Sequence, residues 1–311
     1  MYDALVSADL VTDDPDGSSQ QLVASLGLPT PRPSAFSEPP GHGFRAVWMR
    51  AHPSMKVSPT RIEVIGPRPR TEPGDHLEER MSAQLPRPVR THATVFAGDV
   101  ESVITNLERR GVRHRVSPAG NDFPSPRVWI GVTDDDPLGY DPTVDGGLLA
   151  EVISPDLAGL PTEYADPADF DSYAPGTIVR VAARRFLVAD LDEAVRALDA
   201  NLLLTPSGLV TDTVARRARY TFGIGASAGI ELAQPTSADS DLADFAGKWG
   251  PGPHAVVLAV RGLEQFALDL EVRGTPFTRS ENHEGQWVLH VDTSFTSGTP
   301  FEFQEIEPSP K

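Results

Sequence analysis

Only a few residue types in this chain are suited to chemistry. The sequence contains no cysteine, which excludes disulfides, thiolate-bound zinc, iron–sulfur clusters and cysteine nucleophiles. It also contains no Gly-x-Ser-x-Gly nucleophile elbow and no phosphate-binding Gly-x-x-x-x-Gly-Lys-Ser/Thr loop. Any metal or acid-base chemistry would therefore depend on histidines, carboxylates and neutral oxygens.

Four glutamates share one local pattern, an apolar-Glu-apolar step that ends a β-rich stretch: Glu63, Glu151, Glu231 and Glu302. Each step closes one copy of a repeated unit. In every copy a β-rich run is followed by an Asp or Gly, then by a helical segment, then by further strands. The repeat indicates an α+β fold made of four copies of one strand-helix-strands module.

The second copy shows the pattern most clearly. Residues 91–99 form a β-rich run that ends at Asp99, and the next segment predicts a helix that ends at Arg109-Arg110-Gly111. Basic residues favour the last turn of a helix, and glycine favours the left-handed position that follows it. The apolar residues at i, i+3, i+4 and i+7, which share one helical face, are Val100, Val103, Ile104 and Leu107.

The fourth copy repeats this spacing. Residues 254–262 form the opening run, and the predicted helix ends at Arg273-Gly274. From Asp99 to Gly111 and from Gly262 to Gly274 are 12 residues in each case. The apolar stripe of this helix consists of Leu263, Phe266, Ala267 and Leu270.

The other two copies are less regular. The third opens at 181–190 and closes at 229–232, with a predicted helix between them. The first opens at 4–11, has a helix that is expected to end near Gly27, and closes at 61–65. All four copies together cover most of the chain.

Three segments between or within the copies are rich in proline and charge: 66–90, 154–176 and 234–253. Such composition predicts linkers or surface loops. We take the middle segment as a domain boundary, which gives two domains of two modules each, at 1–160 and 176–307. A chain of 311 residues is long for a single core, since single domains usually stop growing near about 250 to 300 residues.

The repeated unit resembles the vicinal oxygen chelate superfamily, which includes glyoxalases, bleomycin-resistance proteins, methylmalonyl-CoA epimerases and extradiol dioxygenases. The residues that carry the resemblance are the opening run 92–100, the closing run 148–153 and the start of the last copy at 250–257. The resemblance implies that each copy is a βαβββ module. It also implies that two modules pair into one cup and that four modules form two tandem cups.

The resemblance further implies where metal ligands would lie. One position is on the first strand, seven residues before the Asp or Gly that precedes the helix, and the other is the glutamate of the last strand. In the N-terminal cup these positions give His92, Glu63 and Glu151 as metal ligands, with Ser7, Asp9 or a water in a fourth place. One imidazole and two carboxylates suit Mn, Fe, Co, Ni or Zn. Glu63 and Glu151 would also be the catalytic groups, because a loosely held glutamate can shuttle a proton.

The C-terminal cup gives a different prediction. The counted positions are Ala183 and Ala255, and alanine binds no metal. His254 lies one residue away, so in a strand of period two it is expected on the opposite face unless a β-bulge re-aims it. We therefore expect this half to be a scaffold or a metal-free binding cup. The arginine cluster at 216–219 predicts a solvated strand edge rather than a site for an anionic ligand.

These candidates favour a metal-dependent lyase or isomerase that acts on a small oxygenated metabolite. A second hypothesis is a metal-free protein that binds a small drug-like molecule, as bleomycin-resistance proteins do. A third, an extradiol-type dioxygenase, needs a second histidine ligand that the sequence does not place. The alternative role for His92 is a hydrogen-bonded strand histidine, and the alternative for the glutamates is a solvated strand position.

Composition narrows the partners and the location. The net charge of −17 repels nucleic acid and anionic membranes, and no stretch approaches the roughly 20 apolar residues that span a bilayer. The first residues carry no basic run before an apolar core, so no secretory signal is predicted. We expect a cytoplasmic protein whose partner is a small-molecule ligand or substrate.

Overall fold

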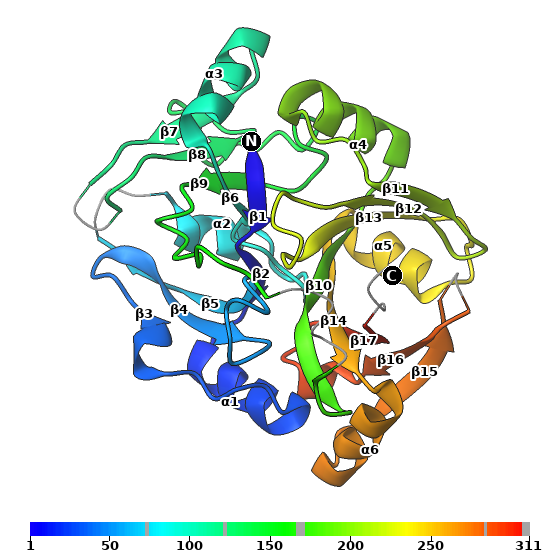
Figure 1. The fold of residues 1–311 in the computed structure, drawn as a ribbon. Helices are drawn as coiled ribbons and strands as arrows, with labels where there is room; N and C mark the ends of the chain where they lie inside the picture. The colour runs from blue at the N-terminus through cyan, green and yellow to red at the C-terminus, as the bar shows by residue number, and fades with distance from the viewer. Residues whose placement is uncertain (72–74, 121–122, 166–171, 283–284, 307–311) are drawn as a thin grey trace.

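A computed structural model gives the fold, and it describes residues 1–71, 75–120, 123–165, 172–282 and 285–306. Four modules follow one another along the chain, each with an opening strand, a helix and further strands (Figure 1). The predicted α+β class with four βαβββ modules is confirmed.

The first two modules form the N-terminal half. The first consists of β1 (Tyr2–Leu5), β2 (Ser7–Val11), α1 (Pro15–Leu26), β3 (Phe36–Ser37), β4 (His42–Arg50) and β5 (Arg61–Arg70). The second consists of β6 (Thr94–Gly98), α3 (Val100–Arg110), β7 (His114–Ser117), β8 (Arg127–Ile130) and β9 (Ala150–Ile153).

The last two modules form the C-terminal half. The third consists of β10 (Thr177–Leu187), α4 (Leu191–Ala197), the π-helical turn η3 (Leu198–Leu202), β11 (Gly208–Thr211), β12 (Ala215–Tyr220) and β13 (Gly229–Pro235). The fourth consists of β14 (Gly252–Arg261), α6 (Leu263–Arg273), β15 (Phe277–Glu281), β16 (Trp287–Val291) and β17 (Phe301–Glu305).

The helices begin and end where the sequence predicts. Asp14, Asp99 and Asp190 are the N-caps of α1, α3 and α4, and each side chain accepts a hydrogen bond from a backbone N–H three residues later. The helices α1, α3 and α6 end at glycines in the left-handed conformation, with φ of 74°, 66° and 70°. Only glycine adopts this conformation without steric cost.

The strands form three sheets. In the C-terminal half, β10 pairs antiparallel with β14, so both modules share one eight-stranded sheet in the order β11-β12-β13-β10-β14-β17-β16-β15. In the N-terminal half the orders are β2-β5-β4-β3 and β1-β6-β9-β8-β7. The backbone of Val6, between β1 and β2, bonds to Val95 and Arg61, so one extended stretch joins these two sheets.

Each closing strand has two different faces. In β5, Ile62 and Val64 are buried in the large apolar core that also contains helix residues, whereas Glu63 and Ile65 point to the opposite side of the sheet. The same alternation puts Phe301 and Phe303 of β17 in that core. We call the side that carries the closing glutamates the cup face.

Two of the predicted loops contain helices. The segment 66–90 includes the end of β5 and helix α2 (Leu77–Ala83), and the segment 234–253 includes helix α5 (Asp241–Trp249). Both helices are short, and packing stabilises such short helices more than their own sequence preference does. The prediction of loops was therefore wrong for these two stretches.

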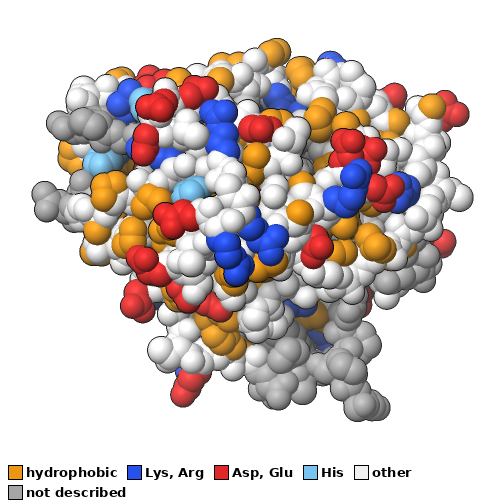
Figure 2. Space-filling view, turned by 90° about the horizontal axis from the view of Figure 1, so that it is seen from above, with side chains coloured by type: hydrophobic (Ala, Val, Ile, Leu, Met, Phe, Trp, Pro, Cys, Tyr) orange, Lys and Arg blue, Asp and Glu red, His pale blue; other side chains and the backbone are white. Residues whose placement is uncertain are grey.

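The segment 154–176 has no α-helix or strand in its described part, and residues 166–171 lie outside the described residues. The domain boundary at this segment stays a prediction. None of the helices in the described ranges has the length and apolar character needed to cross a membrane. Acidic and basic side chains are intermixed on the face of the molecule shown in Figure 2.

Arg87, which follows α2, connects the two halves. Its Nε donates to the carbonyl oxygen of Val89, and its terminal nitrogens donate to four carbonyl oxygens between the end of α5 and the start of β14. The four acceptors, at 2.7 to 3.1 Å, belong to Trp249, Gly250, Pro251 and Pro253. Every one of these acceptors is a backbone atom.

Candidate functional site

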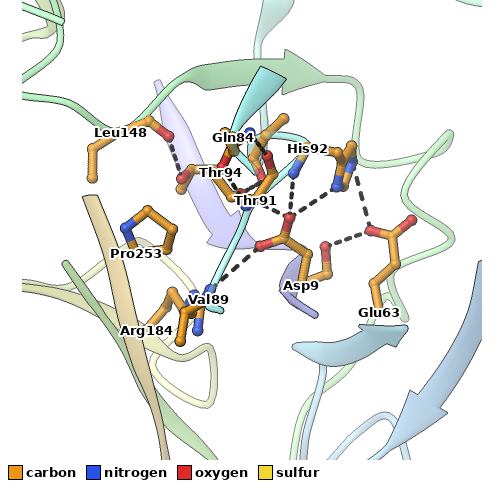
Figure 3. A network of polar contacts seen from close by, with 12 residues as sticks. Asp9, Glu63, Gln84, Val89, Thr91, His92, Thr94, Leu148, Arg184 and Pro253 are labelled. Atoms are coloured by element: carbon orange, nitrogen blue, oxygen red, sulfur yellow. Dashed lines mark hydrogen bonds and ion pairs between the residues drawn. The ribbon is translucent and has the colours of Figure 1, made fainter. Parts of the chain in front are cut away.

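The structure brings together two of the three residues predicted as metal ligands. His92, which precedes β6, lies with its Nε2 3.8 Å from Oε2 of Glu63 on β5. Its Nδ1 and its backbone N–H both contact Oδ2 of Asp9, at 3.0 and 2.6 Å (Figure 3). Ser7 donates to Glu63 at 3.1 Å. The two residues considered for the fourth ligand place, Ser7 and Asp9, are thus part of one buried polar network.

The network holds an unusual set of charges. Burial alone would lower the pKa of His92, but Glu63 and Asp9 outweigh burial and raise this pKa to about 9. Burial raises the pKa of Glu63 to about 7 although His92 opposes the shift. Burial also disfavours the charged form of Asp9, yet its hydrogen bond with His92 leaves its pKa below the ordinary value. At neutral pH His92 is therefore an imidazolium held against Asp9.

The third predicted ligand, Glu151, has another partner. Nη1 of Arg127 on β8 lies 3.2 Å from Oε1 of Glu151, and Nη2 of the same guanidinium lies 2.5 Å from Asp75. Burial raises the pKa of Glu151, while Arg127 opposes the shift. Glu151 is therefore held by an arginine that the sequence gave no reason to expect there.

Helix α2 and aromatic side chains fill the cup face of the N-terminal half. Leu77 and Met81 of α2 are buried in an apolar cluster with Phe44, Val95 and Trp129. The guanidinium carbon of Arg80, also on α2, lies 4.2 Å from the centre of the Trp129 ring. Two large cavities formed by described residues, of about 1000 and 1130 Å³, are lined by neither His92 nor Glu63 nor Glu151.

The contacts of His92, Glu63 and Glu151 show how well a metal ion would fit between these three side chains. Among the residues that the structure describes, no group of three His, Asp or Glu side chains is arranged to hold a metal ion. The arginine on Glu151 repels a cation, and the imidazolium of His92 has no free lone pair at neutral pH. The donors as they stand do not fit a divalent ion, and the metal site at His92, Glu63 and Glu151 stays a prediction.

The cup face of the C-terminal half is hollow. It encloses a cavity of about 1130 Å³ lined by strands of both modules and by α5. Its walls carry apolar side chains from Phe222, Ile224, Leu242, Phe245 and Val257. Its floor carries the two closing glutamates, Glu231 and Glu302, together with several arginines.

Arg185 of β10 bridges the two closing glutamates of this cup. Its Nε lies 2.5 Å from Oε1 of Glu231, and its Nη1 donates to Oε1 of Glu302. Burial would raise the pKa of Glu302, but Arg185 outweighs burial and lowers this pKa to about 2. The Glu302 carboxylate is therefore charged at neutral pH, and the guanidinium of Arg185 lies between it and Glu231.

His254 corrects one of the sequence-based predictions. It lines the cavity instead of pointing to the other face, because the pairing of β10 with β14 shifts next to it: Arg185 pairs with Ala255, and Phe186 pairs with Pro253. Such an irregularity re-aims a side chain. Burial and the nearby Arg185 lower the pKa of His254 to about 3, so its imidazole is neutral.

The arginine cluster also differs from its prediction. Strand β12, which carries it, lies between β11 and β13 and is not an edge strand. Arg217 and Arg219 line the cavity, with their Nε atoms 3.7 and 3.4 Å from the carboxylate of Glu231. Arg216 points to the other side and pairs with Asp192. The cluster therefore contributes two cations to the cup.

The comparisons with known proteins concern the fold. The whole chain is similar to a triply substituted variant of 4-hydroxymandelate synthase from Streptomyces coelicolor, with a TM-score of 0.61 and 14% sequence identity over 100% of this chain and 94% of that one. A methylmalonyl-CoA epimerase from Mycobacterium tuberculosis is similar over 44% of this chain and 93% of its own, with a TM-score of 0.40 and 22% identity. The sequence matches no protein-family model and no curated protein.

The likeness over the full length agrees with four modules in two pairs. The chain has the vicinal oxygen chelate fold. Within this fold the strand register identifies equivalent positions in the two cups. Asp9 pairs with Glu63 on β2 and β5, and Arg185 pairs with Glu231 on β10 and β13. Asp9 and Arg185 therefore occupy the same position with opposite charge.

The histidines are equivalent as well. Val95 pairs with Glu151, and Val257 pairs with Glu302; His92 and His254 each precede that valine by three residues. Each cup of this chain thus carries one histidine and two closing glutamates. The sequence already contained a signal for Arg185, because it lies two residues after Ala183 and so shares its face. Arg127 gave no comparable signal.

Proposed function

We propose that the chain binds a small organic molecule with an anionic group in its C-terminal cup, without a metal ion. The observation that carries this proposal is the cavity of about 1130 Å³ with arginines on its floor. Its volume lies just above the range of small-molecule sites, which is about 300 to 1,000 Å³, so the cavity has room for such a ligand. The proposal corresponds to the binding-protein hypothesis rather than to the lyase or isomerase hypothesis.

The arginines of the cup offer donors to an anion. Arg219 uses Nε toward Glu231, while its terminal nitrogens make no hydrogen bond or ion pair with any described residue. Its side chain is 36% exposed. A planar guanidinium with two free terminal nitrogens suits a carboxylate, which it can bind through two parallel hydrogen bonds.

The walls of the cup offer an apolar surface to the rest of the ligand. The aromatic rings of Phe222 and Phe245 and the aliphatic chains of Ile224, Leu242 and Val257 all line the cavity. An aromatic or branched body would bury apolar area against them, which favours binding by roughly 25 cal/mol per Å². An aromatic carboxylate therefore combines the two features that the cup offers.

The experiment measures the binding of three aromatic acids, benzoate, mandelate and 4-hydroxymandelate, by isothermal titration calorimetry at low ionic strength. 4-Hydroxymandelate is included because the similar structure is a 4-hydroxymandelate synthase by name. We expect saturable binding of at least one acid, and much weaker binding of 1-phenylethane-1,2-diol, which keeps the ring but lacks the carboxylate.

The variant Arg219→Ala should weaken the binding of the acid by about 10-fold, since hydrogen bonds to charged groups contribute about 1.5 kcal/mol or more. The matched control is Arg216→Ala, on the same strand but directed to the other side and paired with Asp192, which should leave affinity unchanged. Failure of all three acids to bind more tightly than the diol would contradict the proposal.

A further inference from the structure

The floor of the C-terminal cup requires a cation. Glu231 and Glu302 have side chains that are only 5% and 10% exposed, and both contact one group, the guanidinium of Arg185. Two carboxylates this deeply buried cannot both be charged unless a positive group lies between them. Arg185 supplies that group from β10, with its own side chain 11% exposed.

A third potential ligand borders the same place. His254 is 8% exposed and lines the cavity, and its Nδ1 has no hydrogen-bond partner among the described residues. Its ring packs edge-on against Phe245, with ring centres 4.8 Å apart. Two carboxylates and a neutral imidazole make a donor set that suits a divalent transition metal. Here an arginine side chain occupies the space between the carboxylates.

We propose that Arg185 is the resident cation of the C-terminal cup. Its guanidinium lies between Glu231 and Glu302, in the place that a divalent ion bound by these two carboxylates would need, and it thereby excludes metal from this place. Unlike an ion, an arginine is covalently tethered and stays charged at every physiological pH. The positive charge between Glu231 and Glu302 therefore does not depend on the supply of metal ions.

Arg185 also positions a ligand, and this part rests on the function proposed above. Nε and Nη1 hold the two glutamates, whereas Nη2 makes no hydrogen bond with a described residue. Because Arg185 lines the cavity, Nη2 is the donor left for an oxygen of a bound molecule. The two glutamates fix the plane of the guanidinium, so this donor has one direction.

The test removes the arginine and asks whether a metal takes its place. Arg185→Ala removes the guanidinium from between Glu231 and Glu302, in the cavity that His254 also lines. This variant should bind Co²⁺, Mn²⁺ or Zn²⁺ at least about 10-fold more tightly than the wild type. Bound Co²⁺ would show the visible absorption of a site with nitrogen and oxygen ligands. The measurement is made by calorimetry and absorption on the full-length chain, without any organic ligand.

Two control variants make the result specific. Arg185→Ala combined with Glu302→Gln removes one carboxylate and should lose the gained affinity. Arg217→Ala removes another arginine of the same cavity, one that is paired with Asp212, while Arg185 stays between the glutamates, so it should gain no affinity. If Arg185→Ala folds like the wild type by circular dichroism and gains no more affinity than these controls, the proposal is overturned.

The repulsion between the two glutamates can also unfold Arg185→Ala in the absence of metal. In that event the readout is refolding: Co²⁺ or Zn²⁺ should restore the wild-type spectrum in Arg185→Ala and not in the double variant, and failure to restore it overturns the proposal. This outcome is independent of the proposed function. If no aromatic acid binds to the wild type but Arg185→Ala gains metal affinity, only the proposed function fails. If an acid binds but Arg185→Ala gains no metal affinity, only the inference about Arg185 fails.

Discussion

The N-terminal and C-terminal cups place the same three groups at equivalent positions, yet one cup is filled and the other is hollow. Both have a first-strand histidine and two closing glutamates; the N-terminal cup adds Asp9 where the C-terminal cup has Arg185. The pKa values of the two histidines are shifted in opposite directions: Glu63 and Asp9 outweigh burial at His92, whereas Arg185 adds to burial at His254. Next to Asp9 and Glu63, His92 has a pKa of about 9, whereas next to Arg185, His254 has a pKa of about 3.

The difference in filling follows from the rest of each cup face. The N-terminal face presents Phe44, Val95 and Trp129, which an apolar helix face can cover, and α2 does so with Leu77 and Met81. The C-terminal face presents arginines and glutamates from five strands. Covering these charged groups with apolar side chains would remove their hydration, which costs free energy. Whether a cup is open to a ligand therefore depends on the residues around the shared histidine and glutamates, not on the shared residues themselves.

The largest expected effect comes from removing Asp9. Asp9→Ala leaves the imidazolium of His92 without its closest carboxylate and the hydroxyl of Thr91 without its acceptor at 2.7 Å. It also removes the carboxylate that lies 3.8 Å from the buried Arg184. Breaking a buried charge pair costs about 3–5 kcal/mol, and we expect a loss of this size in urea unfolding. A loss below about 1 kcal/mol would show that the network contributes little to stability.

The two histidines should respond to pH in opposite directions. The folded pKa of His92, about 9, lies above its ordinary value of 6.5, so the folded state holds more protons between these values and stability falls as pH rises. His254, with a folded pKa of about 3, is protonated more readily in the unfolded state, so its effect appears below pH 6.5, where stability falls as pH falls.

The measurement is the free energy of unfolding of wild type, His92→Gln and His254→Gln from pH 4 to pH 9.5. The wild-type advantage over His92→Gln should be full below about pH 6.5 and shrink by on the order of 1–3 kcal/mol toward pH 9. The advantage over His254→Gln should be full above about pH 6.5 and shrink toward pH 4. Parallel curves for the two variants would refute the assigned protonation states.

The smallest expected effect concerns metal in the N-terminal half. Because Arg127 contacts Glu151 and His92 carries a proton at neutral pH, we expect elemental analysis to find the same low metal content in wild type and His92→Ala, purified without chelator or polyhistidine tag. A stoichiometric ion in the wild type that disappears in His92→Ala would establish the metal site predicted from the sequence, and with it the basis for lyase or isomerase chemistry.

The sequence predicts the modules well because their signals are local. The N-cap Asp99, the C-cap Gly111 and the alternation around Glu151 each depend on neighbours within a few residues. The state of the sites depends on contacts that are distant in sequence. Counting along β14 misplaced His254, because the irregularity beside it arises from pairing with β10. Nothing in the local sequence indicates that Arg127 would neutralise Glu151 or that α2 would cover the N-terminal cup.

Arg87 has a consequence for how this sequence can change over time. Its hydrogen bonds to the other half all go to carbonyl oxygens of residues 249–253, and every amino acid supplies the same carbonyl. The guanidinium carbon also lies 5.4 Å from the centre of the Phe245 ring. Substitutions at the four acceptor positions therefore keep these hydrogen bonds as long as the backbone path is kept, whereas the contact with Phe245 depends on both side chains. Methods that find contacts from correlated substitutions would consequently detect this connection through Phe245 and miss the four hydrogen bonds.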